Sequence, residues 1–172
     1  MEEQRVGTGN GAEPTIVAFF CNWCTYTAAD LTGTSRTKYP PNVRIIRVMC
    51  SGRIDPQFVV DAFARGADGV LIGGCHPGDC HYGEGNYKAL RRVVLLRRVL
   101  HEMGVEDERF RLEWISASEG EKVARVIREM TQTIRGLGRL DLPGRRARWD
   151  AELLGLEAAE PAMAVAAGSD GR

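Results

Sequence analysis

The stretch TIVAFF, residues 15–20, decides the fold of this chain. It is continuously apolar and begins with β-branched residues, which is typical of a strand covered on both faces of a parallel sheet. Cys21 ends the apolar run, and Cys24 follows three residues later. A strand that stops at a Cys-x-x-Cys pair is compatible with a redox disulfide, a zinc site or a metal cluster. The local sequence therefore does not decide the chemistry.

Three further segments have strand character. Residues 43–50, VRIIRVMC, are interrupted by Arg44 and Arg47, so this strand is expected to be less buried than the first. Residues 69–75, GVLIGGC, are short and apolar. Residues 110–116, FRLEWIS, alternate apolar and charged side chains, as in an edge strand with one wet face. The second and third strands, like the first, run into a cysteine.

Helical periodicity fills the intervals between the strands. Asp55-Pro56 predicts a helix start, because a capping side chain precedes proline at the first helical position. A second helix is expected over residues 86–103 and closed by Gly104, and a third follows the capping-box pattern Ser118-x-x-Glu121. A short helix through residues 25–31 is less clearly marked. The residues expected on the buried faces are Val59, Val60, Phe63 and Ala67, then Val93, Leu96, Leu100 and Met103, then Val123, Ile127, Met130 and Ile134.

Alternating strands and helices predict parallel βαβ units with right-handed crossovers, and hence a three-layer α/β domain. The two uncharged strands belong in the middle of the sheet, and the two strands that carry charges belong at its edges. This places about four strands in the order 2-1-3-4, a flavodoxin-like winding.

The organisation of the chain follows from its composition. A length of 172 residues predicts one domain, here residues 15–138. Residues 1–14 are polar and glycine-rich, so they are expected to form a flexible leader. Residues 139–172 are expected to be a disordered or partner-docking tail. Within it, Trp149, Leu153 and Leu156 would share one face of a short docking helix.

Charge and hydropathy exclude two classes of partner. Lys plus Arg and Asp plus Glu balance at 23 each, so no net field attracts nucleic acid or an anionic membrane. No apolar run approaches the roughly 18 residues that a membrane span needs. We therefore expect a cytoplasmic protein, in which five cysteines indicate metal or redox chemistry and not structural disulfides.

The cysteines are predicted to converge. In the expected winding, Cys50, Cys21 and Cys75 close the carboxyl ends of three adjacent strands, which lie about 5 Å apart. Cys24 and Cys80 lie close enough in sequence to fold back to the same edge. The gap between the first and third strands is a topological switch point, the default ligand crevice of an open α/β sheet.

Three interpretations of the five cysteines remain at this stage. Four thiolates delivered from separate loops suit a two-iron iron–sulfur cluster. A Cys-x2-Cys with a distant Cys-x4-Cys would also complete a tetrahedral zinc site in an interaction module. A strand followed by Cys-x-x-Cys favours a thioredoxin-like thiol–disulfide oxidoreductase, although no proline-led strand faces the pair. His76 and His81 flank the last cysteine pair, but their spacing does not match a histidine-ligated cluster.

The chain resembles the iron–sulfur (delta) subunit of methyl-viologen-reducing hydrogenases, the type associated with heterodisulfide reductase. The resemblance is carried by FFCNWCTYTAADL, PPNVRIIRVMCSGRIDP, GADGVLIGGCHPGDCHYGEGNY and RLEWISASEGEKVARVI. It covers about residues 14–136 and includes all five cysteines.

This resemblance implies a specific role. It implies a domain with a 2Fe-2S cluster held by four of the five residues Cys21, Cys24, Cys50, Cys75 and Cys80. Proteins of this kind are non-catalytic and pass electrons between a hydrogenase or other dehydrogenase module and the flavin-bearing subunit of a heterodisulfide reductase. Related subunits also accompany formate dehydrogenases and methylene-tetrahydrofolate reductases. The leader and the Ala-rich tail depart from the family pattern and leave the particular complex open.

Overall fold

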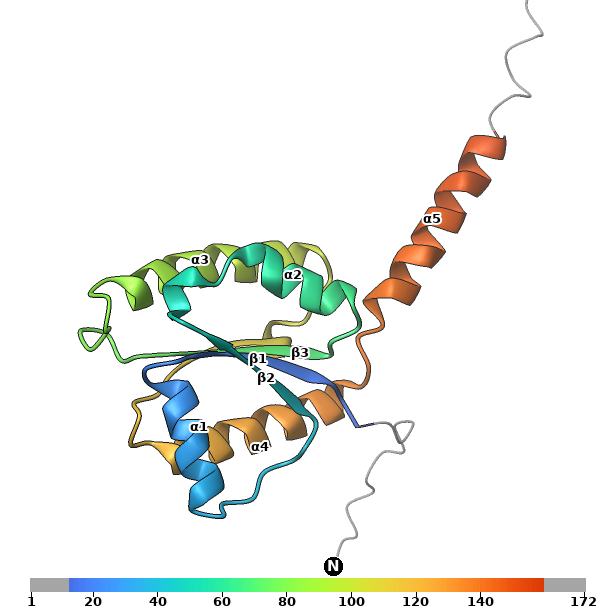
Figure 1. Cartoon of the computed structure of the whole chain (residues 1–172). Coiled ribbons are helices and arrows are strands. Elements are labelled where there is room, and N and C mark those ends of the chain that lie inside the picture. The colour runs from blue at the N-terminus through green and yellow to red at the C-terminus, as the bar shows by residue number, and fades with distance from the viewer. Residues whose placement is uncertain (1–12, 160–172) are drawn as a thin grey trace, which may run out of the picture. The chain divides into compact units, whose positions relative to one another are not determined.

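A four-stranded parallel sheet forms the middle layer of the computed structural model, which describes residues 13–159. Its strands are β1 (Ile16–Cys21), β2 (Val43–Val48), β3 (Gly69–Gly74) and β4 (Phe110–Trp114), in the order β2-β1-β3-β4 (Figure 1). The register pairs Cys21 with Val48 and Gly74 with Trp114, so the carboxyl ends of the strands lie side by side. The predicted fold class and strand order are confirmed.

Two helices cover each face of the sheet. Helices α2 (Pro56–Ala64) and α3 (Gly85–Glu102) lie on one face, and α1 (Thr25–Thr34) and α4 (Gly120–Leu137) lie on the other (Figure 1). Two short 3-10 turns, η1 (Ser51–Arg53) and η2 (Asp107–Arg109), precede α2 and β4. This arrangement is the one that right-handed crossovers impose, because the chain changes face where it changes winding direction.

Burial follows the predicted division between central and edge strands. Every residue of β3 is buried, and five of the six residues of β1 are buried. In β2, by contrast, Arg44, Ile46 and Arg47 are exposed and no residue is fully buried. Phe110 is the one buried residue of β4, so Leu112 and Trp114 are less covered than the alternating pattern predicts.

The helix predictions are partly confirmed. Asp55 caps α2, since its Oδ1 accepts a hydrogen bond from the backbone N–H of Gln57 at 3.0 Å. The residues predicted to be buried on α4 are buried. Two predictions for α3 and α2 are wrong: Met103 is 38% exposed, because it lies one residue past the end of α3, and Val60 is only half-buried.

The capping box predicted at Ser118 is also wrong. Helix α4 begins at Gly120, where a Cβ would lie 3.1 Å from the carbonyl O of Ala28. Close packing of α4 against α1 therefore sets the helix start. The carboxylate of Glu119 instead accepts a hydrogen bond from the backbone N–H of Ser116 at 2.7 Å, which steadies the loop after β4.

A network of buried charge closes the amino ends of the strands. Asp68 is fully buried, and its carboxylate accepts hydrogen bonds from the backbone N–H groups of Thr15 and Leu140 at 2.9 and 3.0 Å. Arg109 is also fully buried, and its Nη1 donates to the carbonyls of Asp68 and Gly138 at 3.1 and 3.0 Å. The sequence analysis did not single out either residue.

Helix α5 (Leu142–Ala159) belongs to a separate unit that begins at Asp141. Trp149 and Leu153 lie one helical turn apart on α5 and are exposed. The side chain of Leu156, residues 1–12 of the expected leader and residues 160–172 of the tail lie outside the described part of the chain. Among residues 13–159, no helix combines the length and apolarity that a membrane span demands.

Candidate metal centre

The carboxyl ends of β1, β2 and β3 carry cysteines at slightly different depths. Cys21 is the last residue of β1, Cys75 directly follows β3, and Cys50 lies two residues beyond β2. β2 is therefore shorter than predicted, because the chain turns into η1 at Ser51. Crossovers leave β1 and β3 in opposite directions, so the cysteines surround the topological switch point of the sheet.

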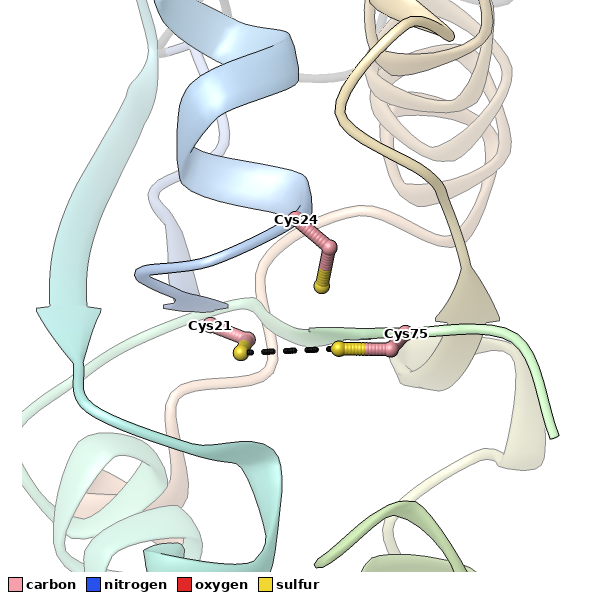
Figure 2. A group of neighbouring side chains, drawn as sticks. All are labelled: Cys21, Cys24 and Cys75. Atoms are coloured by element: carbon pink, nitrogen blue, oxygen red, sulfur yellow. Dashed lines mark hydrogen bonds between the residues drawn. The ribbon is translucent and has the colours of Figure 1, made fainter. Parts of the chain in front are cut away.

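Three thiols form one group, here called the sulfur triad. The Sγ atoms of Cys21, Cys24 and Cys75 all lie within 4.8 Å of one another, and all three residues are buried (Figure 2). Cys24 stands at the start of α1, and the Sγ atoms of Cys21 and Cys75 are 3.9 Å apart (Figure 2).

The other two cysteines form a second group, here called the sulfur pair. The Sγ atoms of Cys50 and Cys80 are 3.9 Å apart, with Cys50 buried and Cys80 half-buried. Cys21 is the triad member that faces this pair: its thiol approaches the carbonyl O of Met49 at 3.8 Å, and the Ser51 backbone N–H points toward its sulfur.

The two 3.9 Å spacings have a chemical meaning. Two thiolates bound to one tetrahedral metal at about 2.3 Å lie about 3.8 Å apart. Each spacing therefore matches two ligands of a single metal. A mononuclear tetrahedral site needs four donors around one point, and residues 13–159 supply three such sulfurs in one group.

The local environment sets which thiols ionise first. A hydrogen bond from Cys24 lowers the pKa of Cys21 to about 5, and that same bond together with burial raises the pKa of Cys24. Burial raises the pKa of Cys75, and it raises that of Cys50 to about 11. Metal binding must displace protons from these thiols, so its affinity rises with pH.

Cys80 has a different environment. Burial raises its pKa, but the backbone N–H groups of Tyr82, Asn86 and Gly85 outweigh burial, so the pKa lies below its ordinary value. These N–H groups belong to the turn before α3 and to its first residues, where the helix dipole also favours a negative charge. The chain thus provides hydrogen-bond donors for a thiolate at this position.

Asn86 is a site residue that the sequence analysis missed. Its side chain is 1% exposed, and its Nδ2 donates to the carbonyls of His76 and Cys75 at 2.7 and 3.4 Å. It therefore fastens the chain after β3 to the start of α3. The available signal was an asparagine in the first turn of a helix that directly follows a cysteine-rich loop.

Ser51 carries a buried hydroxyl beside the same segments. Among the described residues, its Oγ is the one buried side-chain N or O atom without a hydrogen-bond partner. It lies against the end of β3, since a Cβ added at Gly74 would be 2.9 Å from it. A buried hydroxyl without a partner is costly, and an acceptor bound at this end of the sheet would offset that cost.

Aromatic side chains cover the outer side of the site. The rings of Trp23 and His81 stack with centroids 3.8 Å apart, and the Trp23 Nε1–H donates to the Tyr82 hydroxyl at 3.3 Å. Beside them lies a cavity of about 270 Å³, lined by Cys24, Cys75 and six further residues. The stack joins the loop of the first two cysteines to the loop that follows Cys80.

The fold and the site together define a class: α/β domains of flavodoxin-like winding that gather cysteine side chains at the switch point of the sheet. Comparison with known proteins then identifies the family. The chain belongs to the family described as methyl-viologen-reducing hydrogenase, delta subunit, whose profile matches residues 16–138. The resemblance seen in the sequence is confirmed.

The matching region forms most of some relatives and only a small part of another. The chain is 62% identical over 126 residues to an iron-sulfur subunit of the F420-non-reducing hydrogenase of Archaeoglobus profundus, a match covering 73% of this chain and 92% of the relative. It is 60% identical over 126 residues to the vhc iron-sulfur subunit of the F420-non-reducing hydrogenase of Methanococcus voltae, covering 73% and 88%. It is also 50% identical over 125 residues to one subunit of the ferredoxin/F420H2-dependent CoB-CoM heterodisulfide reductase of Methanosarcina acetivorans, covering 73% of this chain and 16% of that protein.

Proposed function

We propose that this protein is an electron-transfer subunit that holds a 2Fe-2S cluster between its sulfur triad and its sulfur pair. The observation that carries the proposal is the occurrence of two Sγ–Sγ spacings of 3.9 Å at the carboxyl end of the sheet, one between Cys21 and Cys75 and one between Cys50 and Cys80. Cys50 and Cys80 would bind one iron, and two of Cys21, Cys24 and Cys75 would bind the other. The spare thiol is then a member of the triad.

The donor set and its surroundings suit such a cluster. All five donors are sulfur, four of the five cysteines are buried, and backbone N–H groups point at Cys21 and Cys80. When bound, the cluster supplies a one-electron carrier. The residues of this chain bury most of the ligands, donate hydrogen bonds to the thiolates and hold Cys21 and Cys75 at the ends of buried strands, so little has to move when the charge changes.

The relatives support the choice of partners. Relatives named hydrogenase iron-sulfur subunits match almost end to end, whereas the heterodisulfide reductase relative contains the matching region within a far longer chain. A region that is fused to another subunit in one protein and separate in another supports a shared partner for the two. We therefore propose two partners in the cytoplasm: a flavin-bearing subunit of heterodisulfide reductase type, and a hydrogenase, formate dehydrogenase or similar module.

Metal analysis of anaerobically purified protein tests the cluster. We expect a brown protein with about two irons and two sulfides per chain. Colourless protein with one zinc per chain would support the zinc-stabilised module instead. Reduction of insulin by metal-free protein in the presence of dithiothreitol would support the thiol–disulfide oxidoreductase.

Five single Cys→Ser variants test the ligand set. Cys50→Ser and Cys80→Ser should lose the visible absorption of the cluster, and one variant among Cys21→Ser, Cys24→Ser and Cys75→Ser should retain nearly all of it. Full retention in Cys50→Ser or Cys80→Ser would contradict the division into triad and pair.

A further inference from the structure

Two glycines from segments distant in sequence meet beside the sulfur pair. A Cβ added at Gly52, in η1, would lie 2.7 Å from both the Cα and the carbonyl O of Gly85, the first residue of α3. A distance this short requires the backbone itself to move. The two main chains are therefore in direct contact, with no side chain between them.

The contact at Gly85 also involves both sulfurs. A Cβ added there would overlap the Sγ of Cys50 and would lie 3.1 Å from the Sγ of Cys80. The missing side chain of Gly85 thus leaves the space in which the Cys50 sulfur lies. Gly85 does not adopt a positive φ, so space and not backbone conformation is the reason for glycine here.

Gly52 makes two further interactions with the same segments. Its backbone N–H donates to the Sγ of Cys50 at 3.4 Å, and its carbonyl accepts a hydrogen bond from Nη1 of Arg92 at 2.6 Å. The same Nη1 also donates to the carbonyl of Ile54 at 3.1 Å. Arg92, from α3, therefore holds the middle of η1 and the residue after it against the helix whose first turn faces Cys80.

We propose that Gly52, Gly85 and Arg92 are positioning residues that bring Cys50 to Cys80, so that the two sulfurs act as one bidentate ligand unit. Cys80 is carried by the loop before α3, whereas Cys50 is carried by the chain after β2, and the strand ends alone do not bring these segments together. The contact between Gly52 and Gly85, together with the hydrogen bonds from Arg92 (here called the arginine clamp), brings these segments together. The claim that the two sulfurs act as one ligand unit rests on the proposed function. The claim that these three residues bring the two thiols together in the metal-free chain does not depend on it.

Oxidative cross-linking of the metal-free, full-length protein tests the geometry. In a chain with Cys21, Cys24 and Cys75 replaced by serine, Cys50 and Cys80 are the remaining thiols. Diamide takes up two electrons and two protons as the two thiols form a disulfide. We expect Gly85→Ala to slow this reaction at least tenfold and Gly52→Ala to slow it similarly.

Two matched variants separate positioning from general damage. Gly33→Ala, in α1, adds the same methyl group where no atom lies within 4 Å, and it should leave the rate unchanged. Arg92→Leu removes the clamp from an exposed position and should slow cross-linking severalfold, whereas Arg92→Lys should recover part of the rate. Circular dichroism checks that each variant is folded.

A pair of outcomes would overturn the inference. It fails if Gly85→Ala cross-links at the parental rate, or if Gly33→Ala and Gly85→Ala slow the reaction equally. Iron analysis of the same substitutions in the natural five-cysteine chain is read separately. If the variants change the cross-linking rate as expected but no variant contains iron, the cluster is rejected and the positioning role is upheld.

Discussion

Buried polar groups at the two ends of the sheet differ in how completely they are hydrogen-bonded. At the amino ends of the strands, Asp68 and Arg109 are fully buried and bonded to main-chain groups of Thr15, Leu140 and Gly138. At the carboxyl ends, four cysteines are buried with few hydrogen bonds among them, and the Ser51 hydroxyl has no partner among the described residues.

This difference separates stability from function. Removing one partner of a buried charge that is fully bonded within the chain strongly destabilises the fold, and such a charge has no capacity left for a ligand. A group of buried thiols with matched spacings can take up a metal in place of its protons, and this binding adds to the stability of the folded state. Changes at the amino end should therefore affect folding alone, and changes in the segments that hold the cysteines at the carboxyl end should affect metal retention as well.

The largest effect is expected at Arg109. Arg109→Leu leaves the carbonyls of Asp68 and Gly138 without this donor in a buried position, and it should reduce the free energy of unfolding by about 3–5 kcal/mol. Urea denaturation of the metal-free protein measures this change. The metal content of the folded fraction should equal that of the parent; a selective loss of metal would contradict the separation of the two ends.

An intermediate effect is expected at Asn86. Asn86→Ala removes the donor to the carbonyls of Cys75 and His76 and should destabilise the metal-free protein by about 1–3 kcal/mol. Asn86→Asp keeps an acceptor oxygen but lacks the N–H donors, so it should be equally harmful. Both variants should also lose metal faster to a chelator. Parental stability in either variant would show that these hydrogen bonds are dispensable.

The smallest effect is expected at Glu119. Hydrogen bonds from the Ser116 backbone and His76 lower the pKa of this carboxylate from 4.5 to about 2. A lowered pKa stabilises the folded state above pH 4.5, and this contribution is lost as the pH falls toward 2. Because the side chain is 35% exposed, solvent screening limits it to less than about 1 kcal/mol.

Glu119→Gln should therefore flatten the acid limb of the stability curve between pH 4.5 and 2. Urea midpoints measured across this range check the result, with Glu121→Gln, in the first turn of α4, as the matched control. An unchanged acid limb in Glu119→Gln would show that the bond to Ser116 does not couple to folding.

The fold was largely predictable because its signals are local. The apolar runs that became β1 and β3, the charges in β2 and the Asp55 cap each act within a few residues, and short-range physics sets their structure. The boundary of α4 was not predictable in this way. Gly120 starts that helix because α1 lies against it, and no pattern around Ser118 reports this contact.

The candidate site, like the fold, was predictable from the sequence only where local patterns determine it. Strand order places Cys21, Cys50 and Cys75 at the carboxyl end of the sheet, and strand order follows from the sequence pattern. The grouping into a triad and a pair depends on where Cys24 and Cys80 point, and these residues lie in a helix start and a loop. The roles of Asn86, Gly52 and Gly85 became visible only once the turns were packed.

The sequence by itself determined the parallel sheet, its winding and the end at which the sulfurs gather, since hydrophobic periodicity and crossover handedness suffice for these. Tertiary structure alone decided which sulfurs are neighbours, which glycines must stay small and where the charged groups at the opposite end find their partners. The physical reason is range: propensity and patterning act between residues close in sequence, whereas a spacing of 3.9 Å between Cys50 and Cys80 depends on two segments that meet only in the folded chain.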